Sequence, residues 1–151
     1  MRIKVDQSGK IEQTAINTVL AFSDGEQRTL LIPAQVKRQA LAYLRGREKS
    51  RKSSVLLVFS AALFLLLKEI AEQITLVIID GEYEGHEATI RGRLLQLLRE
   101  AGLQVHTDAI AFGSVGKKSE AHYLAWRVNK GEISPDHRVT LSELLEILQQ
   151  K

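Results

Sequence analysis

Residues 74–79 (ITLVII) restrict the architecture of this chain strongly, because they predict a strand that has no polar face. β-Branched and other apolar residues follow one another there, and the segment ends in Asp80-Gly81. Such a strand is typical of the interior of a sheet that is covered on both sides. A helical pattern follows over 86–101, and another strand is predicted over 103–112. We therefore expect an α/β protein whose inner strands are parallel.

The N-terminal part of the chain predicts an antiparallel region in the same sheet. Apolar and polar residues alternate over 2–6, so the chain opens on a strand and not on a signal peptide. The apolar segments 17–22 and 28–32 flank Asp24-Gly25. An Asp-Gly pair between apolar segments is a strong hairpin signal, because both residues tolerate positive φ. Up to three antiparallel strands are expected here.

The apolar run over 55–67 predicts a buried core element. It is 13 residues long, whereas a membrane-spanning helix needs about 20. We predict a helix, capped by Ser53 or Ser54 and extending to about Glu72. The alternative is a short buried strand over 55–59 followed by a helix, since periodicity does not distinguish the two in an apolar run. A preceding helix is predicted over 34–44, directly at Pro33.

The last third of the chain predicts two further helices. A loop and then a helix are expected over 114–130, and Gly131 ends that helix. Thr140 and Glu143 have the spacing of a capping box, which opens a last helix that extends to about residue 149. We treat residues 1–151 as a single domain in which 132–151 form an appended C-terminal helix.

Composition excludes several classes of chemistry. The 151 residues include no cysteine, which excludes disulfides, zinc–thiolate sites, iron–sulfur clusters and thiol nucleophiles. The P-loop, G-x-G-x-x-G, G-x-S-x-G and H-E-x-x-H motifs are also missing from the sequence. The net charge of +3 favours a polyanionic partner only mildly. A reducing cytoplasm fits the lack of cysteine best, so we expect a cytoplasmic protein that does not associate with membranes.

Acidic residues stand where chemistry is expected. Asp6 ends the first strand, Asp80 ends the most hydrophobic strand, and Glu120 lies in the first turn of a later helix. Ligands of parallel α/β sheets bind beyond the carboxyl ends of the strands, so Asp6 and Asp80 converge if their strands are neighbours. Clustered carboxylates need a counter-charge, which Mg²⁺ or Mn²⁺ supplies. Glu82 and Glu84, just beyond Asp80, are alternatives to it.

The order of these elements resembles the ribonuclease H-like superfamily, and within it the RuvC-type Holliday-junction resolvases. The resemblance rests on an acidic first strand (IKVDQSG, 3–9), a hairpin, a helical stretch and a central strand that ends in an acid (LVIID, 76–80). A helix, a strand and a helix with a polar start (KSEAH, 118–122) complete it. It implies a ribonuclease H-like mixed sheet, with antiparallel N-terminal strands and parallel inner strands, flanked by helices.

The resemblance also implies a function. A metal-dependent nuclease would hydrolyse phosphodiester bonds in structured nucleic acid, as in DNA recombination. Asp6, Asp80 and Glu120 would hold Mg²⁺ or Mn²⁺, and His122 would be an alternative ligand or a general acid/base. A resolvase cuts two strands and so implies a homodimer, for which the predicted helices 54–73 or 140–149 could supply the interface.

Basic residues are placed for a phosphate-rich partner, DNA rather than RNA. Residues 37–52 contain seven Lys or Arg and one Glu. Contacts of this kind fix the register of a nucleic acid and not its sequence. The residues expected to make them are Arg47, Lys49, Arg51, Lys52, Arg91, Arg93, Lys117 and Lys118.

Two alternatives to an enzyme follow from the same observations. One is a non-catalytic nucleic-acid-binding module of the same fold, and the other is an interaction protein that docks a partner through 55–67. Aromatic residues make up only 5% of the chain, which argues against a stacking platform for single strands. Tyr123 and Trp126 are expected in the core or in a dimer contact.

Overall fold

The N-terminal strands form the antiparallel region that the sequence predicts. In the computed structural model, which describes residues 1–116 and 119–150, β1 (Arg2–Ser8) pairs with β2 (Thr18–Asp24). β2 pairs in turn with β3 (Glu26–Ile32). Gly25 joins β2 to β3 with a φ of 82°, which glycine adopts without strain. The predicted hairpin is therefore confirmed.

The other strands are parallel to their neighbours. β4 (Leu76–Asp80) lies beside β1, β5 (Ile110–Gly113) beside β4, and the short β6 (His137–Arg138) beside β3. The order across the sheet is β5-β4-β1-β2-β3-β6, so β1 and β4 both lie inside it. β5 begins later than predicted, because a 3₁₀ turn, η2 (Thr107–Ala109), precedes it. The expected α/β architecture with a mixed sheet is confirmed, with parallel pairing of β1, β4 and β5.

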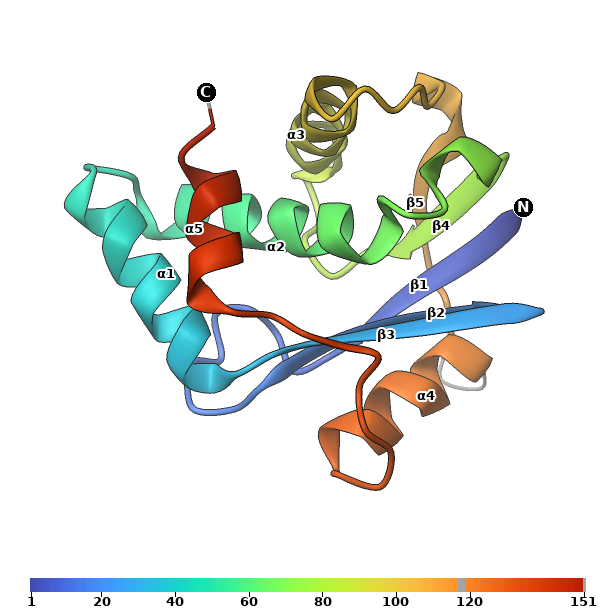
Figure 1. Ribbon diagram of the computed structural model, residues 1–151, viewed down its shortest axis with the longest axis horizontal. Helices are drawn as coiled ribbons and strands as arrows, with labels where there is room; N and C mark the ends of the chain where they lie inside the picture. Colours follow the sequence, from blue (N-terminus) through green and yellow to red (C-terminus); the bar gives the residue numbers. More distant parts are fainter. Residues whose placement is uncertain (117–118, 151) are drawn as a thin grey trace.

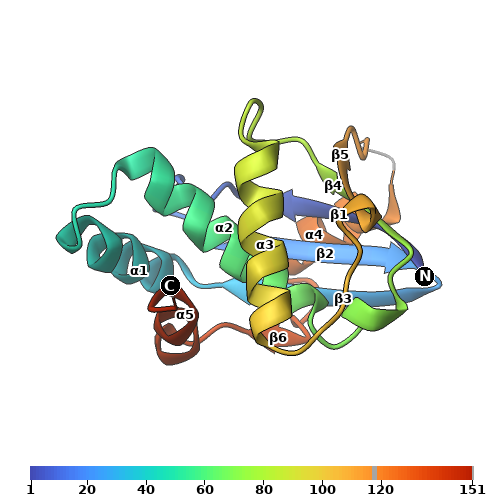
Figure 2. The ribbon, with the colours of Figure 1, turned by 90° about the horizontal axis from the view of Figure 1, so that it is seen from above.

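Helices cover the two faces of the sheet unequally. The helices are α1 (Ala34–Gly46), α2 (Arg51–Leu67), α3 (Glu87–Glu100), α4 (Glu120–Asn129) and α5 (Leu141–Leu148). Of these, only α4 lies on the lower side of the sheet in Figure 1, and Figure 2 shows α2 and α3 crossing the other side. Successive side chains of β2 point to opposite faces of the sheet. Leu20 and Phe22 enter the large core with α2, while Val19 and Ala21 pack against α4.

Helix α2 is the central core helix. The helix prediction for 55–67 is confirmed against the strand alternative, but the N-cap is Ser50, whose Oγ accepts a hydrogen bond from the Ser53 backbone N–H (3.1 Å). Ser54 is already helical, and its hydroxyl donates to the Ser50 carbonyl. α2 ends at Leu67, and a 3₁₀ turn, η1 (Ala71–Gln73), leads to β4. Most of its apolar residues are buried within the chain, so they offer no docking or dimer surface.

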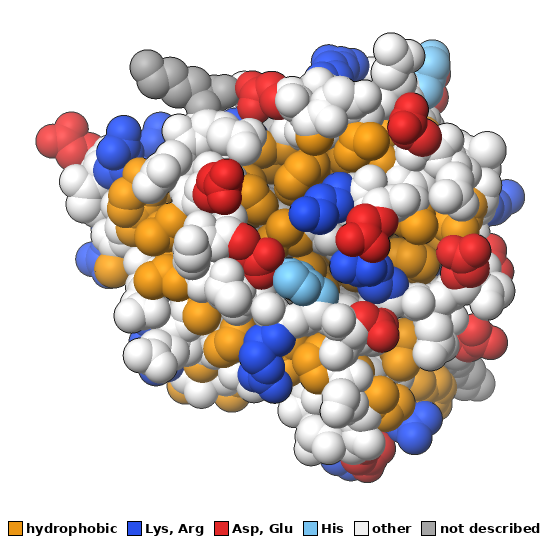
Figure 3. Space-filling model, in the orientation of Figure 1, with side chains coloured by type: hydrophobic (Ala, Val, Ile, Leu, Met, Phe, Trp, Pro, Cys, Tyr) orange, Lys and Arg blue, Asp and Glu red, His pale blue; other side chains and the backbone are white. Residues whose placement is uncertain are grey.

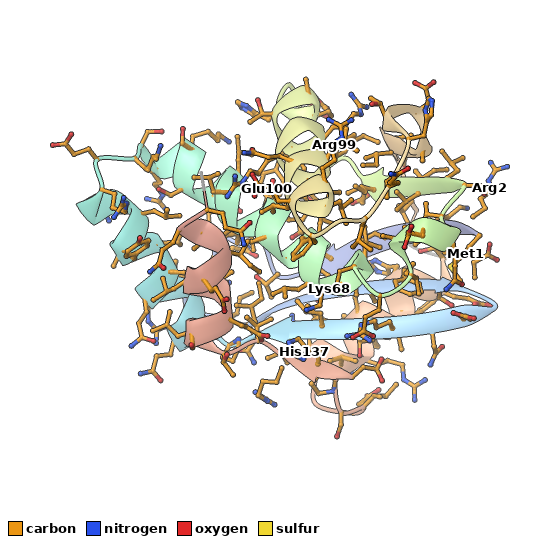
Figure 4. The ribbon with its side chains drawn as sticks, turned by 45° about the horizontal axis from the view of Figure 1, so that its top comes forward. Met1, Arg2, Lys68, Arg99, Glu100 and His137 are labelled. Atoms are coloured by element: carbon orange, nitrogen blue, oxygen red, sulfur yellow. The ribbon has the colours of Figure 1, made fainter. Side chains whose placement is uncertain are left out.

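No helix among the described residues is both long enough and apolar enough to cross a bilayer. The N-terminus lies beside the segment that leads to β4. The terminal ammonium of Met1, which Figure 4 labels, donates to the Gln73 carbonyl (2.6 Å).

The C-terminal segment completes the same core. The Thr140 hydroxyl accepts from the Glu143 backbone N–H, and the Glu143 carboxylate accepts from the Thr140 backbone N–H, which confirms the predicted capping box of α5. The same carboxylate lies 2.7 Å from Nε2 of His137, which Figure 4 labels at β6. Leu144 and Ile147 are buried in the same core as α2, and β6 pairs with β3, so the described part of the C-terminal segment packs into the main core.

Candidate metal centre

Two central strands bring Asp6 and Asp80 together. β1 and β4 are parallel, and Val5 is the register partner of Ile79, so the next residue of each strand is an aspartate. The side chains of Ile3 and Val5 enter the large core, and alternation turns Asp6 to the α4 face. The sequence prediction that these two aspartates converge is confirmed by this register.

Glu82 is the third acid of the cluster. One carboxylate oxygen from each of Asp6, Asp80 and Glu82 lies within 4.8 Å of the other two. A turn just after β4 brings Glu82 back, and its backbone N–H donates to the Asp80 carbonyl (2.9 Å). This acidic triad could hold a metal ion, since oxygen ligands of this kind suit hard divalent cations.

His122, on α4, contacts the triad through Asp6. Its Nδ1 lies 2.8 Å from Oδ2 of Asp6, which is 5% exposed. The N-cap of α4 fixes this histidine, because the Ser119 hydroxyl accepts from the His122 backbone N–H (3.0 Å). The other oxygen of Asp6 accepts from the Gln7 backbone N–H (2.8 Å). Both oxygens of Asp6 therefore have a nitrogen partner.

Burial and mutual repulsion raise the pKa values of Asp6 and Glu82. Burial is the main cause that raises the pKa of Asp6, and the charge of Asp80 adds to it, while the hydrogen bonds from His122 and Gln7 oppose it. Burial also raises the pKa of Glu82, together with a hydrogen bond and the charge of Asp80. Lys10, whose Nζ lies 3.6 Å from Glu82, offsets part of this. The cluster is therefore stabilised when one of these carboxyl groups takes up a proton or when a cation binds to it.

Glu120 does not belong to the triad. Its carboxylate accepts a hydrogen bond from the Ser23 hydroxyl (2.8 Å) and lines a depression beside Arg2 and Lys4. Successive residues of a helix are about 100° apart, so Glu120 and His122 project in directions about 200° apart. Only one of them can face Asp6, and that one is His122. The third ligand predicted from the sequence is corrected accordingly, from Glu120 to Glu82.

The loop between β1 and β2 supports the triad through buried polar contacts. The Tyr83 hydroxyl accepts from the Ile11 backbone N–H (3.3 Å) and donates to Glu12 (3.2 Å). The Nζ of Lys37, which is fully buried, donates to the carbonyls of Lys10 (3.1 Å) and Gln13 (2.7 Å). These bonds fix the part of the β1–β2 loop that contains Lys10, and so place its ammonium group next to the Glu82 carboxylate.

The buried contacts of Tyr83 and Lys37 could not be predicted from the sequence. A lysine in an amphipathic helix gives no sign of burial, and the partners of Lys37 are mostly backbone carbonyls. No sequence pattern marks such acceptors, whereas the position of Glu82 two residues after Asp80 was a usable signal.

The predicted basic residues that the structure describes do not gather at the triad. Arg47, Lys49, Arg51 and Lys52 lie at the α1–α2 connection, away from the face that carries α4. In the orientation of Figure 3, Lys and Arg side chains are interspersed with Asp and Glu and form no patch of one sign.

The two arginines of α3 that were predicted to bind nucleic acid, Arg91 and Arg93, have structural contacts. Arg91 donates to the Ile110 carbonyl (3.1 Å) and lies over the Phe112 ring, 5.4 Å from its centroid. Arg93 donates to the carbonyls of Ile147 (3.3 Å) and Gln150 (3.1 Å) at the end of α5. Lys117 and Lys118 lie outside the described residues.

Comparisons of the chain with protein-family models, with curated proteins and with solved structures find no match. The interpretation of the triad therefore depends on its own geometry and chemistry.

Proposed function

We propose that this protein is a metal-dependent nuclease of ribonuclease H-like fold that hydrolyses phosphodiester bonds in structured nucleic acid, in the manner of a resolvase. The observation that carries the proposal is the meeting of Asp6, Asp80 and Glu82 with His122, where β4 ends beside the parallel strand β1. The elements on which the family resemblance rests support it, because each occurs in the expected order.

The donor set suits Mg²⁺ or Mn²⁺. All three acids offer oxygen atoms, two of them have a raised pKa, and one of the causes is repulsion by Asp80. A divalent cation relieves that repulsion, so the residues present fit the ion. When bound, it would polarise a phosphoryl oxygen and lower the pKa of a coordinated water.

His122 is suited to hold or move a proton beside this ion. Its Nδ1–H donates to Asp6, which leaves Nε2 as the ring nitrogen that can accept a proton or, in the imidazolium form, donate one to a leaving oxygen. Its side chain is 35% exposed, so a substrate can reach it. We accordingly assign His122 to general acid/base chemistry and not to the ligand set.

The proposal extends to the setting of the reaction. We propose DNA rather than RNA as substrate, a cytoplasmic location, and two copies acting together on two strands. Since α2 is buried within the chain, the interface of such a dimer would have to involve other surfaces.

Cleavage assays test the nuclease directly. Branched, double-stranded and DNA–RNA hybrid substrates are incubated with the full chain in Mg²⁺ or Mn²⁺. Asp6→Asn and Asp80→Asn should lower the rate by more than the roughly 10- to 100-fold that loss of an outer-shell residue costs. Asp108→Asn is the matched control, because Asp108 is exposed and pairs with His106 alone among the described residues. Cleavage that survives both triad substitutions would reject the proposal.

A second candidate is a nucleic-acid-binding module without catalysis. The salt bridge from Lys10 to Glu82 favours it, because an ammonium already supplies part of the counter-charge that the triad needs. This candidate predicts salt-dependent binding of nucleic acid and no cleavage with either metal.

A further inference from the structure

The exposed large hydrophobic side chains of the described residues gather at α4. They are Ile16 (45% exposed), Tyr123 (53%) and Trp126 (43%). Ile16 belongs to the loop after β1, where its Cδ1 and Nδ2 of Asn129, the last residue of α4, both approach Gly9. Of the two expectations for Tyr123 and Trp126, a place in the core is therefore wrong, and a dimer contact stays a prediction. Both residues are exposed on α4, the helix that also contains His122.

Trp126 lies on the flank of α4 that borders the metal centre. It follows His122 by four residues and precedes Asn129 by three, and residues at these spacings share one side of a helix. Both neighbours reach β1, since His122 contacts Asp6 and Asn129 donates to the Ser8 carbonyl (3.1 Å). Trp126 is therefore one turn, or about 6 Å along the helix axis, from the histidine of the site.

A cation accompanies the indole ring. The Nζ of Lys130 lies 3.9 Å from the centroid of the Trp126 ring, and it also lies 3.4 Å from a carboxylate oxygen of Glu132. Lys130 is half-exposed, so its charge can reach a phosphate group. An exposed aromatic ring beside an ammonium group offers a base a surface for stacking and its phosphate a counter-charge.

We propose that Trp126 stacks on an unpaired base of the substrate, next to the phosphodiester that the triad addresses, with Lys130 contacting the backbone. The proposal rests on the nucleic-acid function proposed above and adds the substrate class: DNA with a single-stranded segment or an unpaired base near the cleavage point. Two observations favour this occupant over a second copy of the chain. The ring is on the same flank of α4 as His122, and the ammonium of Lys130, itself paired with Glu132, lies over it.

Fluorescence tests the stacking, because Trp126 is the only tryptophan of the chain. The full-length protein is titrated in EDTA, which prevents cleavage, with single-stranded oligothymidylate and with a blunt duplex that contains the same number of nucleotides. We expect saturable quenching by the single strand and a much smaller effect of the duplex. Absence of quenching by the single strand, or equal quenching by the blunt duplex, would overturn the proposal.

Variants measure how much the ring contributes. Trp126→Leu should weaken binding of a labelled single strand by roughly 5- to 150-fold, the range that one base–aromatic stack provides. Trp126→Phe should retain most of the affinity. Tyr43→Leu is the control, because Tyr43 forms a cation–π pair with Arg47 on α1, away from the metal centre. Unchanged affinity of Trp126→Leu, or an equal loss in Tyr43→Leu, would overturn the proposal, provided that melting temperatures confirm folding.

Two further measurements separate this proposal from its alternatives. Sedimentation that shows a dimer which Trp126→Leu dissociates, without binding of the single strand, would assign the ring to a second copy and overturn the stacking. Cleavage without quenching rejects the stacking alone, whereas quenching without metal-dependent cleavage supports it and rejects the nuclease.

Discussion

The Nδ1 atom of His122 lies 2.8 Å from Oδ2 of Asp6, although 116 residues separate the two in sequence. The contact joins the first turn of α4 to the central strand β1, across the face of the sheet that α4 covers. It gives Asp6 a partner that opposes the effects of burial and of Asp80 on its pKa. Among the described contacts, Asp80 accepts instead from the Val115 backbone N–H and Glu82 pairs with Lys10.

Removal of one charge from the triad should stabilise the metal-free protein. Asp80 raises the pKa of both Asp6 and Glu82, so its charge repels theirs. The Asn side chain of Asp80→Asn keeps the oxygen that accepts from the Val115 backbone N–H. We expect a gain of about 1 kcal/mol, or a melting temperature about 2–4 °C higher in EDTA.

The same variant should lose the stabilisation that metal gives. A ligand present at 100 times its dissociation constant stabilises a protein by about 2.7 kcal/mol. Differential scanning fluorimetry with Mn²⁺ should show this gain in the wild type and in Asp108→Asn, but not in Asp80→Asn. An Asp80→Asn protein that melts lower in EDTA and still responds to Mn²⁺ would contradict both expectations.

Substitutions of Glu82 and Glu120 can decide which of these two glutamates is the third metal ligand. Glu82→Gln should weaken Mn²⁺ binding by more than about tenfold in isothermal titration calorimetry, since a direct ligand is expected to matter more than an outer-shell residue. Glu120→Gln should leave the affinity unchanged, because its carboxylate accepts from Ser23. Glu84→Gln is the neighbouring control, as Glu84 is exposed. The reverse ranking would restore Glu120 to the site.

The sequence was sufficient to predict the two aspartates of the site. Asp80 ends its strand as predicted, β1 continues past Asp6 to Ser8, and parallel pairing of the two strands makes the aspartates neighbours. The third ligand could not be predicted in the same way. The approach of Glu82 depends on a turn after β4, and the direction of Glu120 depends on the rotational phase of α4, which Ser119 sets by capping.

The fold likewise contains elements that local sequence patterns predict and elements that depend on backbone geometry or tertiary contacts. Alternation and the Asp24-Gly25 pair predicted the antiparallel strands, and the Thr140–Glu143 spacing predicted α5. The start of α2 was misplaced because three serines near it could serve as caps, and the choice of Ser50 depends on backbone geometry. Pairing of the short β6 with β3 is a tertiary event with no local signal.

Metal affinity should fall as the solution becomes more acidic. The pKa values of Asp6 and Glu82 are raised in the folded protein, chiefly by burial, so these acids bind protons more tightly than in the unfolded chain. Between the unfolded and folded pKa values, the stability of the metal-free protein therefore falls as pH rises. Mn²⁺ competes with those protons, so the stabilisation it provides should grow with pH.

Melting temperatures with and without Mn²⁺, measured from about pH 4 to pH 7, check this. The two curves should diverge as pH rises, and in Asp80→Asn they should stay together at every pH. Parallel curves for the wild type would show that the two acids do not take part in metal binding.

Lys37 should give the protein a stability that rises with alkaline pH. Burial lowers its pKa from 10.5 to about 8, so between these values the unfolded chain holds a proton that the folded protein has released. Stability therefore increases with pH across this window, by at most about 3 kcal/mol, and the cost of burying the ammonium is fully present below pH 8. Urea unfolding at several pH values from 7 to 10 measures this change.

Lys37→Met separates the lysine from the other groups that titrate. Methionine fills a similar volume but leaves the Lys10 and Gln13 carbonyls without their donor, so we expect a loss of about 1–3 kcal/mol near pH 9. The difference between wild type and variant should widen from pH 8 to pH 10, because only the wild type gains from deprotonation. Lys49→Met, at an exposed position, should follow the wild type. A constant difference across this range would mean that Lys37 stays charged in the folded protein and that its three acceptors compensate for burial.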